Sequence, residues 1–335
     1  MITTAREYQL VRRPVGLPTA EDFRVVTREL PPIGQGQVRV RNLFLSVDPY
    51  MRGRMLEAKS YAPPYQLESP LDGGAVGRVE ESTQPGFAAG DLVLSMQGWR
   101  EGFLSDGKGL TRLEASAAPP QAFLGTLGMP GLTAYVGLFD VGSLERAETV
   151  LVSGAAGAVG MVVCQIAKVM ECRVIGVVGT DEKAAWLRDH AGVDATINYR
   201  LETNLRKAID SLAPDGVDLT FENVGGNHLE AAIACSKTFG RVVICGLISQ
   251  YNATERGPGL QNVREILTKR LTVRGFIVRD HAKRQPDFIR DMAAWIEAGK
   301  MKWAETLVDG FERMPEAFLD LFRGANLGKM VVRLQ

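Results

Sequence analysis

The feature that most restricts the fold is a short apolar segment that runs through a glycine-rich turn directly into a helical pattern. The run TVLVSGAAGAVGMVVCQIAK (149–168) carries Gly154, Gly157 and Gly160 at this turn. Glycines there permit a tight turn, close approach of backbone to a pyrophosphate, and close packing of helix on sheet. The following helix would offer free N–H groups to the phosphates. A glycine pattern alone also suits an ordinary turn, but strand, loop, helix and second strand follow within about thirty residues, which favours a nicotinamide dinucleotide site.

The region from Gly128 onward alternates apolar runs with amphipathic helical patterns, which is typical of βαβ units and a parallel sheet. The expected strands are 149–153, 173–178, 195–199, 217–222, 241–246 and 271–278. The expected helices include 161–170, 182–191, 263–270 and 287–299. Six such strands fill a doubly wound sheet, so we predict a Rossmann domain over residues 128–299.

The first 127 residues have a different texture, with short β-type runs separated by Pro and Gly. These runs are 37–47, 75–82 and 91–96. They predict a compact, mainly β domain. A helix at 315–324 and a strand at 329–334 are expected in the tail, and we predict that residues 300–335 return to complete the sheet of the first domain.

Composition and charge indicate a small-molecule partner. Lys plus Arg and Asp plus Glu number 39 each, and the chain has no long basic run, so a nucleic-acid partner is not expected. The amino-terminal run MITTAREYQLVRRPVG has charges where a signal peptide needs apolar residues, and no later segment is apolar over about 18 residues. We therefore expect a cytoplasmic protein with no membrane partner.

The distribution of Cys and His argues against a catalytic metal. Many two-domain dehydrogenases of this arrangement bind zinc through cysteine and histidine of the first domain. Here no Cys precedes Cys164 and no His precedes His190, and carboxylates alone would make an unusual zinc site. We expect no metal, which argues against zinc-assisted alcohol dehydrogenation as the reaction. The cysteines lie in apolar patterns without C-x-x-C spacing, which predicts buried, reduced thiols.

The end of the second expected strand indicates which dinucleotide binds. An NAD site would place a carboxylate there to bind the ribose 2′-hydroxyl. The sequence RVIGVVGTDEK instead has Gly179 and Thr180 at that position and Lys183 one helical turn further on. A cation suits a 2′-phosphate, so NADP is favoured, with a solvated helix charge as the alternative for Lys183. Asp181 is expected to be an N-cap.

Several longer motifs carry a resemblance to a known family. They are LSVDPYMRGRM (45–55), LGMPGLTAY (127–135), GAAGAVG (154–160), DEK (181–183), ENVGG (222–226), CGLISQYN (245–252), GFIV (275–278) and NLGKMVV (326–332). The chain resembles, from end to end, the zinc-independent medium-chain dehydrogenases/reductases, which include leukotriene/prostaglandin reductases, plant double-bond reductases and a bacterial curcumin reductase. The resemblance implies a GroES-like, mainly β catalytic domain beside the six-stranded Rossmann sheet, NADPH as cofactor, and a homodimer. The run 270–278 could supply the dimer edge.

The resemblance also implies the cofactor contacts. Pyrophosphate contacts fall to Gly157, Ala158, Val159 and Gly160, and 2′-phosphate contacts to Lys183 and Tyr199. The nicotinamide and ribose contacts fall to Asn223, Cys245, Gly246, Leu247, Ile248, Ser249, Gln250, Tyr251, Phe276, Ile277, Val278 and Asn326. For Asn223 and Asn326 the alternative is a turn residue beside a glycine.

The implied reaction is reduction of the carbon–carbon double bond of an α,β-unsaturated ketone or aldehyde, by hydride transfer from NADPH to the β-carbon. Tyr251 is the candidate donor to the enolate oxygen, with a ribose hydroxyl of the cofactor as the alternative. Tyr50 is expected to line the cleft, or else to be a packed aromatic residue. An NADPH quinone reductase on the same fold is the alternative enzyme. A non-catalytic NADPH- or RNA-binding protein is disfavoured by the neutral net charge.

Overall fold

The computed structural model describes residues 1–114, 118–255 and 257–334, which form two compact units. Unit 1 comprises Met1–Leu124, Glu305–Asn326 and Met330–Gln335. Unit 2 comprises Gly125–Ala304 and Leu327–Lys329. No helix in the described part of the chain is long and apolar enough to cross a membrane.

Unit 1 is mainly β. Its strands are β1 (Thr4–Leu10), β2 (Phe23–Glu29), β3 (Val38–Ser46), β4 (Ala75–Ser82), β5 (Leu92–Ser95), β6 (Gly102–Ser105), β7 (Thr111–Arg112), β14 (Glu305–Asp309) and β15 (Lys329–Arg333), and its α-helices are α1 (Tyr50–Arg54) and α9 (Met314–Arg323). Among the described residues, seven strands form one sheet in the order β14-β15-β3-β4-β5-β7, with β6 also on β3, and β1 pairs separately with β2. The core surrounds Trp99, which is fully buried against Tyr8, Phe23 and Phe318.

Unit 2 is an α/β domain with a parallel sheet. Its strands are β8 (Thr149–Val152), β9 (Arg173–Val178), β10 (Ala195–Asn198), β11 (Val217–Glu222), β12 (Ser236–Ile244) and β13 (Thr272–Gly275). Its α-helices are α2 (Met129–Val136), α3 (Gly160–Val169), α4 (Asp181–Ala191), α5 (Leu205–Leu212), α6 (Asn227–Cys235), α7 (Val263–Thr268) and α8 (Gln285–Glu297), with a π-helix η3 (Gly137–Val141) and 3₁₀-helices η4 (Ile248–Gln250) and η5 (Val278–Arg284). Within the described ranges the six strands lie in the order β10-β9-β8-β11-β12-β13. This is the doubly wound order of a Rossmann sheet, so the predicted fold class is confirmed.

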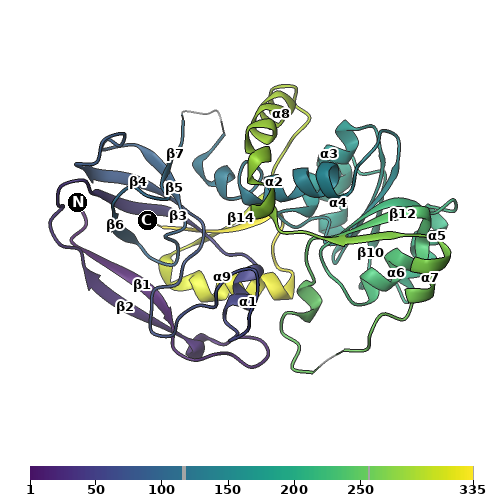
Figure 1. Ribbon diagram of the computed structural model, residues 1–335, viewed down its shortest axis with the longest axis horizontal. Helices are drawn as coiled ribbons and strands as arrows, with labels where there is room; N and C mark the ends of the chain where they lie inside the picture. Colours follow the sequence, from purple (N-terminus) through teal and green to yellow (C-terminus); the bar gives the residue numbers. More distant parts are fainter. Residues whose placement is uncertain (115–117, 256, 335) are drawn as a thin grey trace. The chain divides into compact units, whose positions relative to one another are not determined.

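The two faces of this sheet follow from the alternation of side chains along β8. Val150 and Val152 pack in one core with α3 and α4, whereas Leu151 packs in a second core with α5 and α6 (Figure 1). The chain leaves β8 and β11 toward opposite edges of the sheet, so the topological switch point lies between these two strands. Open α/β sheets bind dinucleotides at the carboxyl ends of the strands beside such a point.

The last strand of the parallel sheet, β13, is shorter than the sequence predicts. The expected strand 271–278 ends at Gly275, and the segment that follows leaves the sheet. The Phe276 ring packs edge-on against Phe221, with ring centroids 6.4 Å apart. Gly137 makes room for both rings, because a Cβ there would lie 2.5 Å from Phe221 and 2.9 Å from Phe276. From Phe276 onward the chain therefore packs this ring against Phe221 instead of continuing to pair with β12.

Candidate cofactor site

The turn between β8 and α3 is a cradle that excludes side chains. Gly154 has a φ of 56°, a left-handed conformation that favours glycine. A Cβ on Gly160 would lie 2.3 Å from the Gly154 carbonyl oxygen, and a Cβ on Gly157 would lie 3.2 Å from the same atom. Gly328 closes the turn from the other side, since its N–H donates to the Ala156 carbonyl at 2.8 Å. Exposed backbone at the start of α3 fits a pyrophosphate group.

The carboxyl end of β9 is covered by an aromatic ring. The Tyr199 N–H donates to the Val178 carbonyl at 3.0 Å, and a Cβ on Gly179 would lie 3.1 Å from the Tyr199 ring. The His228 ring packs edge-on against Tyr199, with centroids 5.0 Å apart. Burial lowers the pKa of His228 to about 4, so this imidazole is neutral near pH 7. The contact between His228 and Tyr199 was not predicted, because it depends on how α6 packs.

Two cations that follow β9 and β10, Lys183 and Arg200, interact electrostatically. Lys183 is half-buried on the first turn of α4. Burial lowers its pKa, and the positive charge of Arg200 lowers it further. Arg200 is exposed and directly follows Tyr199. An anion such as a 2′-phosphate would stabilise these two neighbouring positive charges. Arg200 is therefore a second candidate for binding the 2′-phosphate, in addition to the predicted Lys183. Its place after the third strand was the only sequence signal for it.

The cap of α4 differs from the predicted one. Thr180 is the N-cap, and its hydroxyl accepts from the Lys183 N–H at 3.3 Å. Asp181 is the first helical residue, so its predicted role as the cap was wrong. Thr180 has the extended backbone that an N-cap requires, whereas the Asp181 carboxylate accepts from the Asn198 side-chain amide at 2.8 Å. Asn198 in turn accepts from the Arg200 N–H at 3.2 Å.

The carboxyl end of β11 is joined to the end of β8. The Asn223 side-chain amide donates to the Ser153 carbonyl at 2.7 Å, and the Asn223 N–H donates to the Ser153 hydroxyl at 2.8 Å. That hydroxyl donates to the buried Glu222 carboxyl at 2.8 Å. Asn223 therefore holds the turn after β11 against the end of β8, and its contact with the cofactor stays a prediction.

The segment after β12 folds back over the end of β11. The N–H groups of Cys245 and Gly246 donate to the Glu222 carbonyl at 2.8 and 3.2 Å. The Tyr251 hydroxyl accepts from the Leu247 N–H at 3.2 Å, and burial raises its pKa. The Tyr251 oxygen accepts this hydrogen bond, and its single hydroxyl hydrogen can still be donated to another group.

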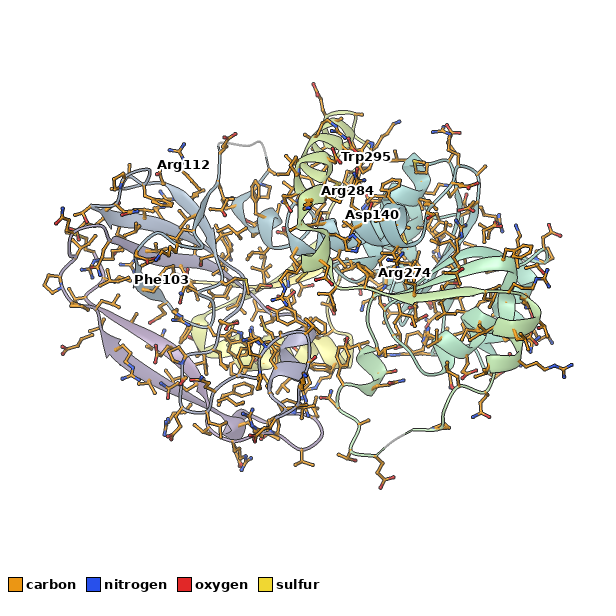
Figure 2. All side chains as sticks on the ribbon, viewed as in Figure 1. Phe103, Arg112, Asp140, Arg274, Arg284 and Trp295 are labelled. Atoms are coloured by element: carbon orange, nitrogen blue, oxygen red, sulfur yellow. The ribbon has the colours of Figure 1, made fainter. Side chains whose placement is uncertain are left out.

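The segment after β13 is fixed by an ionic cluster. The Asp140 carboxylate of η3 contacts two residues of η5, His281 at 3.1 Å to Nδ1 and Arg284 at 3.0 Å to Nε. Figure 2 shows Asp140 and Arg284 close to α8. With the Phe276 ring packed on Phe221, both ends of this segment are anchored.

Most of the predicted contact residues come together at one edge of the sheet. In unit 2, they follow the carboxyl ends of successive strands: Gly157 to Gly160 after β8, Lys183 after β9, Tyr199 after β10, Asn223 after β11, Cys245 to Tyr251 after β12, and Phe276 to Val278 after β13. The other two belong to unit 1. Tyr50 begins α1, half-buried, with its pKa raised by burial and by the charge of Asp48, and Asn326 is the residue before the chain re-enters unit 2.

Three of the four cysteine thiols are buried, and the side chains that commonly bind metals do not cluster in the described part of the chain. Cys164, Cys172 and Cys235 are buried free thiols, whereas Cys245 is half-buried, so the expectation of burial holds for three of the four. Among residues 1–114, 118–255 and 257–334, no group of three or more His, Cys, Asp or Glu side chains is placed to hold a metal ion.

Comparison with known proteins identifies both halves of the chain. Residues 6–113 match the family model described as the N-terminal domain of oxidoreductase, and residues 158–298 match the one described as zinc-binding dehydrogenase. Prostaglandin reductase 1 of Rattus norvegicus is 42% identical, with 98% of this chain and 99% of the relative covered. The NADP⁺-dependent 2-alkenal reductase of Nicotiana tabacum is 41% identical, with 95% and 94% covered.

Solved structures give the same result. The crystal structure of CurA from Vibrio vulnificus in complex with NADPH has a TM-score of 0.93 at 41% identity, covering 98% of this chain and 99% of that chain. The Escherichia coli quinone oxidoreductase complexed with NADPH, at 22% identity and a TM-score of 0.77 with 98% and 99% covered, shares the fold. The chain belongs to the medium-chain dehydrogenase/reductase family and is an NADP-dependent oxidoreductase.

Proposed function

We propose that this protein uses NADPH to reduce the carbon–carbon double bond of α,β-unsaturated ketones or aldehydes. The observation that carries the proposal is the similarity over nearly the whole chain to a 2-alkenal reductase and a prostaglandin reductase. The likeness to quinone oxidoreductases is restricted to the fold.

Different residues of unit 2 would bind the pyrophosphate and the 2′-phosphate of the cofactor. The backbone from Gly157 through Ala158 and Val159 to Gly160 would bind the pyrophosphate, in a turn so tight that a Cβ on Gly160 would lie 2.3 Å from the Gly154 carbonyl oxygen. Lys183 and Arg200 would bind the 2′-phosphate, together with Tyr199, whose ring lies against Gly179. NADPH, when bound, supplies the hydride.

The substrate half needs a donor at the carbonyl oxygen. Hydride addition at the β-carbon turns the carbonyl oxygen into an enolate oxygen, and a preorganised O–H donor stabilises that charge. Tyr251 is assigned this role, because its oxygen is held by the Leu247 N–H while its hydrogen remains to be donated. We assign Tyr50 to the substrate wall. A neutral donor suffices for this chemistry, so the proposal includes no metal.

The proposal extends to the organisation of the protein. We assign residues 1–127 and 300–335 to the catalytic domain and 128–299 to the cofactor domain, with Asn326 completing the cofactor contacts. A homodimer is proposed through β13, which is an edge strand of its sheet with exposed Thr272, Arg274 and Gly275. We place the protein in the cytoplasm.

The test is NADPH oxidation with an aryl enone, an alkenal, a quinone and a saturated ketone, with products identified by mass and NMR. Formation of the saturated carbonyl compound from the enone or alkenal is the expected result. Activity restricted to the quinone would replace the proposal with quinone reduction. Inactivity on all four would leave only cofactor binding.

A further inference from the structure

Glu222 is a fully buried acid at the switch point of the sheet. Its side chain ends β11 with no solvent exposure. One carboxyl oxygen, Oε1, accepts three hydrogen bonds, from the Ser153 hydroxyl at 2.8 Å and from the N–H groups of Val224 and Gly225 at 2.7 Å each. A single oxygen therefore holds the turn that follows β11 against the end of β8.

The same residue also fixes the end of β12. Its backbone carbonyl accepts from the N–H groups of Cys245 and Gly246, at 2.8 and 3.2 Å. Glu222 thus connects the ends of three strands, and each of these ends carries residues assigned to the cofactor site. None of its bonds is to a cation.

The second carboxyl oxygen indicates which protonation state the site holds. Oε2 is buried and has no hydrogen-bond partner among the described residues. A carboxylate spreads its charge over both oxygens, so ionisation would place charge on a buried atom without a donor, which is costly. Burial raises the pKa of Glu222 despite the three bonds to Oε1.

Several titratable groups lie on the elements packed around β11. Burial raises the pKa of Cys245 and of Cys235 to about 12, raises that of Tyr251, and lowers that of His228 to about 4. The Glu230 carboxylate of α6 accepts from backbone N–H groups of the following loop. None of these groups carries a positive charge near pH 7, and the cations of β12, Lys237 and Arg241, are paired with Asp218 and Glu148.

We propose that Glu222 is a positioning residue that works as a neutral carboxylic acid, holding the Asn223–Gly225 turn and making NADPH binding weaken at high pH. A dinucleotide brings several negative charges to this edge of the sheet. An ionised, buried carboxylate would repel them, whereas the protonated form does not. The inference rests on the cofactor half of the proposed function, and its test needs no substrate.

The first test is the stability of the cofactor-free protein as a function of pH. The unfolded pKa of a glutamate is about 4.3, and the folded pKa of Glu222 lies above it. Its stabilising effect is therefore complete below the unfolded value and is lost as pH rises toward the folded value. Glu222→Gln keeps an oxygen for the three donors and cannot ionise. The ratio of unfolding constants, wild type over Glu222→Gln, should grow about tenfold per pH unit and then level.

The matched control is Glu145→Gln, which removes an exposed carboxylate near the opposite end of β8. Its ratio to wild type should stay nearly flat over the same pH range. A flat ratio for Glu222→Gln as well would overturn the proposal, because Glu222 would then titrate normally.

The second test is NADP⁺ affinity by calorimetry, at pH values where the cofactor phosphates are fully ionised. Wild-type affinity should fall as Glu222 ionises, and binding should take up protons, measured in two buffers of different ionisation enthalpy. Glu222→Gln should show neither effect. Weaker binding by Glu222→Gln at every pH would overturn the proposal, since the ionised form would then be the one that holds the turn. A wild type that binds no NADP⁺ would refute the cofactor site itself, while the stability test would still report on Glu222.

Discussion

Discrimination between NADP⁺ and NAD⁺ should depend on Lys183 and, to a smaller extent, on Arg200. The perturbations are Lys183→Ala, Arg200→Gln and the double variant. Lys183 is half-buried, so a bond from it to a phosphate would be partly shielded from water. Arg200 is exposed, and solvent screens its charge.

The expected magnitudes follow from this difference in burial. A hydrogen bond to a charged group contributes about 1.5–3 kcal/mol, so Lys183→Ala should weaken NADP⁺ binding roughly 10- to 150-fold. An exposed ion pair contributes about 0.2–1 kcal/mol, so Arg200→Gln should weaken binding by at most about fivefold. The two effects should not add, because the cations repel one another in the free protein and loss of either relieves the other.

The assay is calorimetric titration of each variant with NADP⁺ and with NAD⁺. NAD⁺ binding should change little, because it has no 2′-phosphate. Lys207→Ala, which removes an exposed lysine from the first turn of α5, is the control and should bind both cofactors like the wild type. Equal losses of NADP⁺ and NAD⁺ affinity in Lys183→Ala would refute the phosphate role.

Three further predictions concern the turn, the donor and the metal. Gly160→Ala puts a Cβ 2.3 Å from a backbone oxygen, so it should lower the melting temperature and weaken NADP⁺ binding; Gly157→Ala, with 3.2 Å of room, should do both less, and the reverse order would contradict the packing argument. Tyr251→Phe should lower kcat for an enone by about 10²-fold with NADPH affinity nearly unchanged, as measured by steady-state kinetics; undiminished kcat would remove its role. Dialysis against a chelator should leave enone reduction unchanged, and loss of activity restored by zinc would overturn the metal-free assignment.

The sequence was most informative where local patterns determine structure. The apolar runs of β8, β9 and β11 were located to within a residue, because buried parallel strands are continuous apolar segments. The predicted strand at 271–278 is longer than β13, which ends at Gly275. Its aromatic and β-branched residues have strand propensity, but the Phe276 ring finds its partner in Phe221.

The cation pair shows what the sequence alone could not provide. Lys183 was predicted because its distance from the end of β9 is short and regular. Arg200 lies on a different crossover, and it reaches Lys183 only because β10 pairs with β9 in parallel, with Asn198 opposite Val178. That juxtaposition depends on strand order, which the periodicity of either segment does not specify. The same holds for His228 against Tyr199.

The charge at the phosphate-binding edge depends on how its carboxylates are held as much as on its cations. NADP is favoured if no acid binds the ribose at the end of β9, yet Asp181, which the sequence predicted to be an N-cap, lies only two residues beyond Gly179. In the structure the Asn198 side-chain amide donates to the Asp181 carboxylate, so this acid has a hydrogen-bond partner within the protein. Among the described residues, Glu222 at the end of β11 has no such partner for Oε2, and burial raises its pKa, which favours the neutral form. The two acids beside the proposed anion-binding site are thus compatible with it for different reasons: Asp181 has a neutral hydrogen-bond donor, and Glu222 is proposed to be protonated. Only the second should give cofactor affinity a dependence on pH.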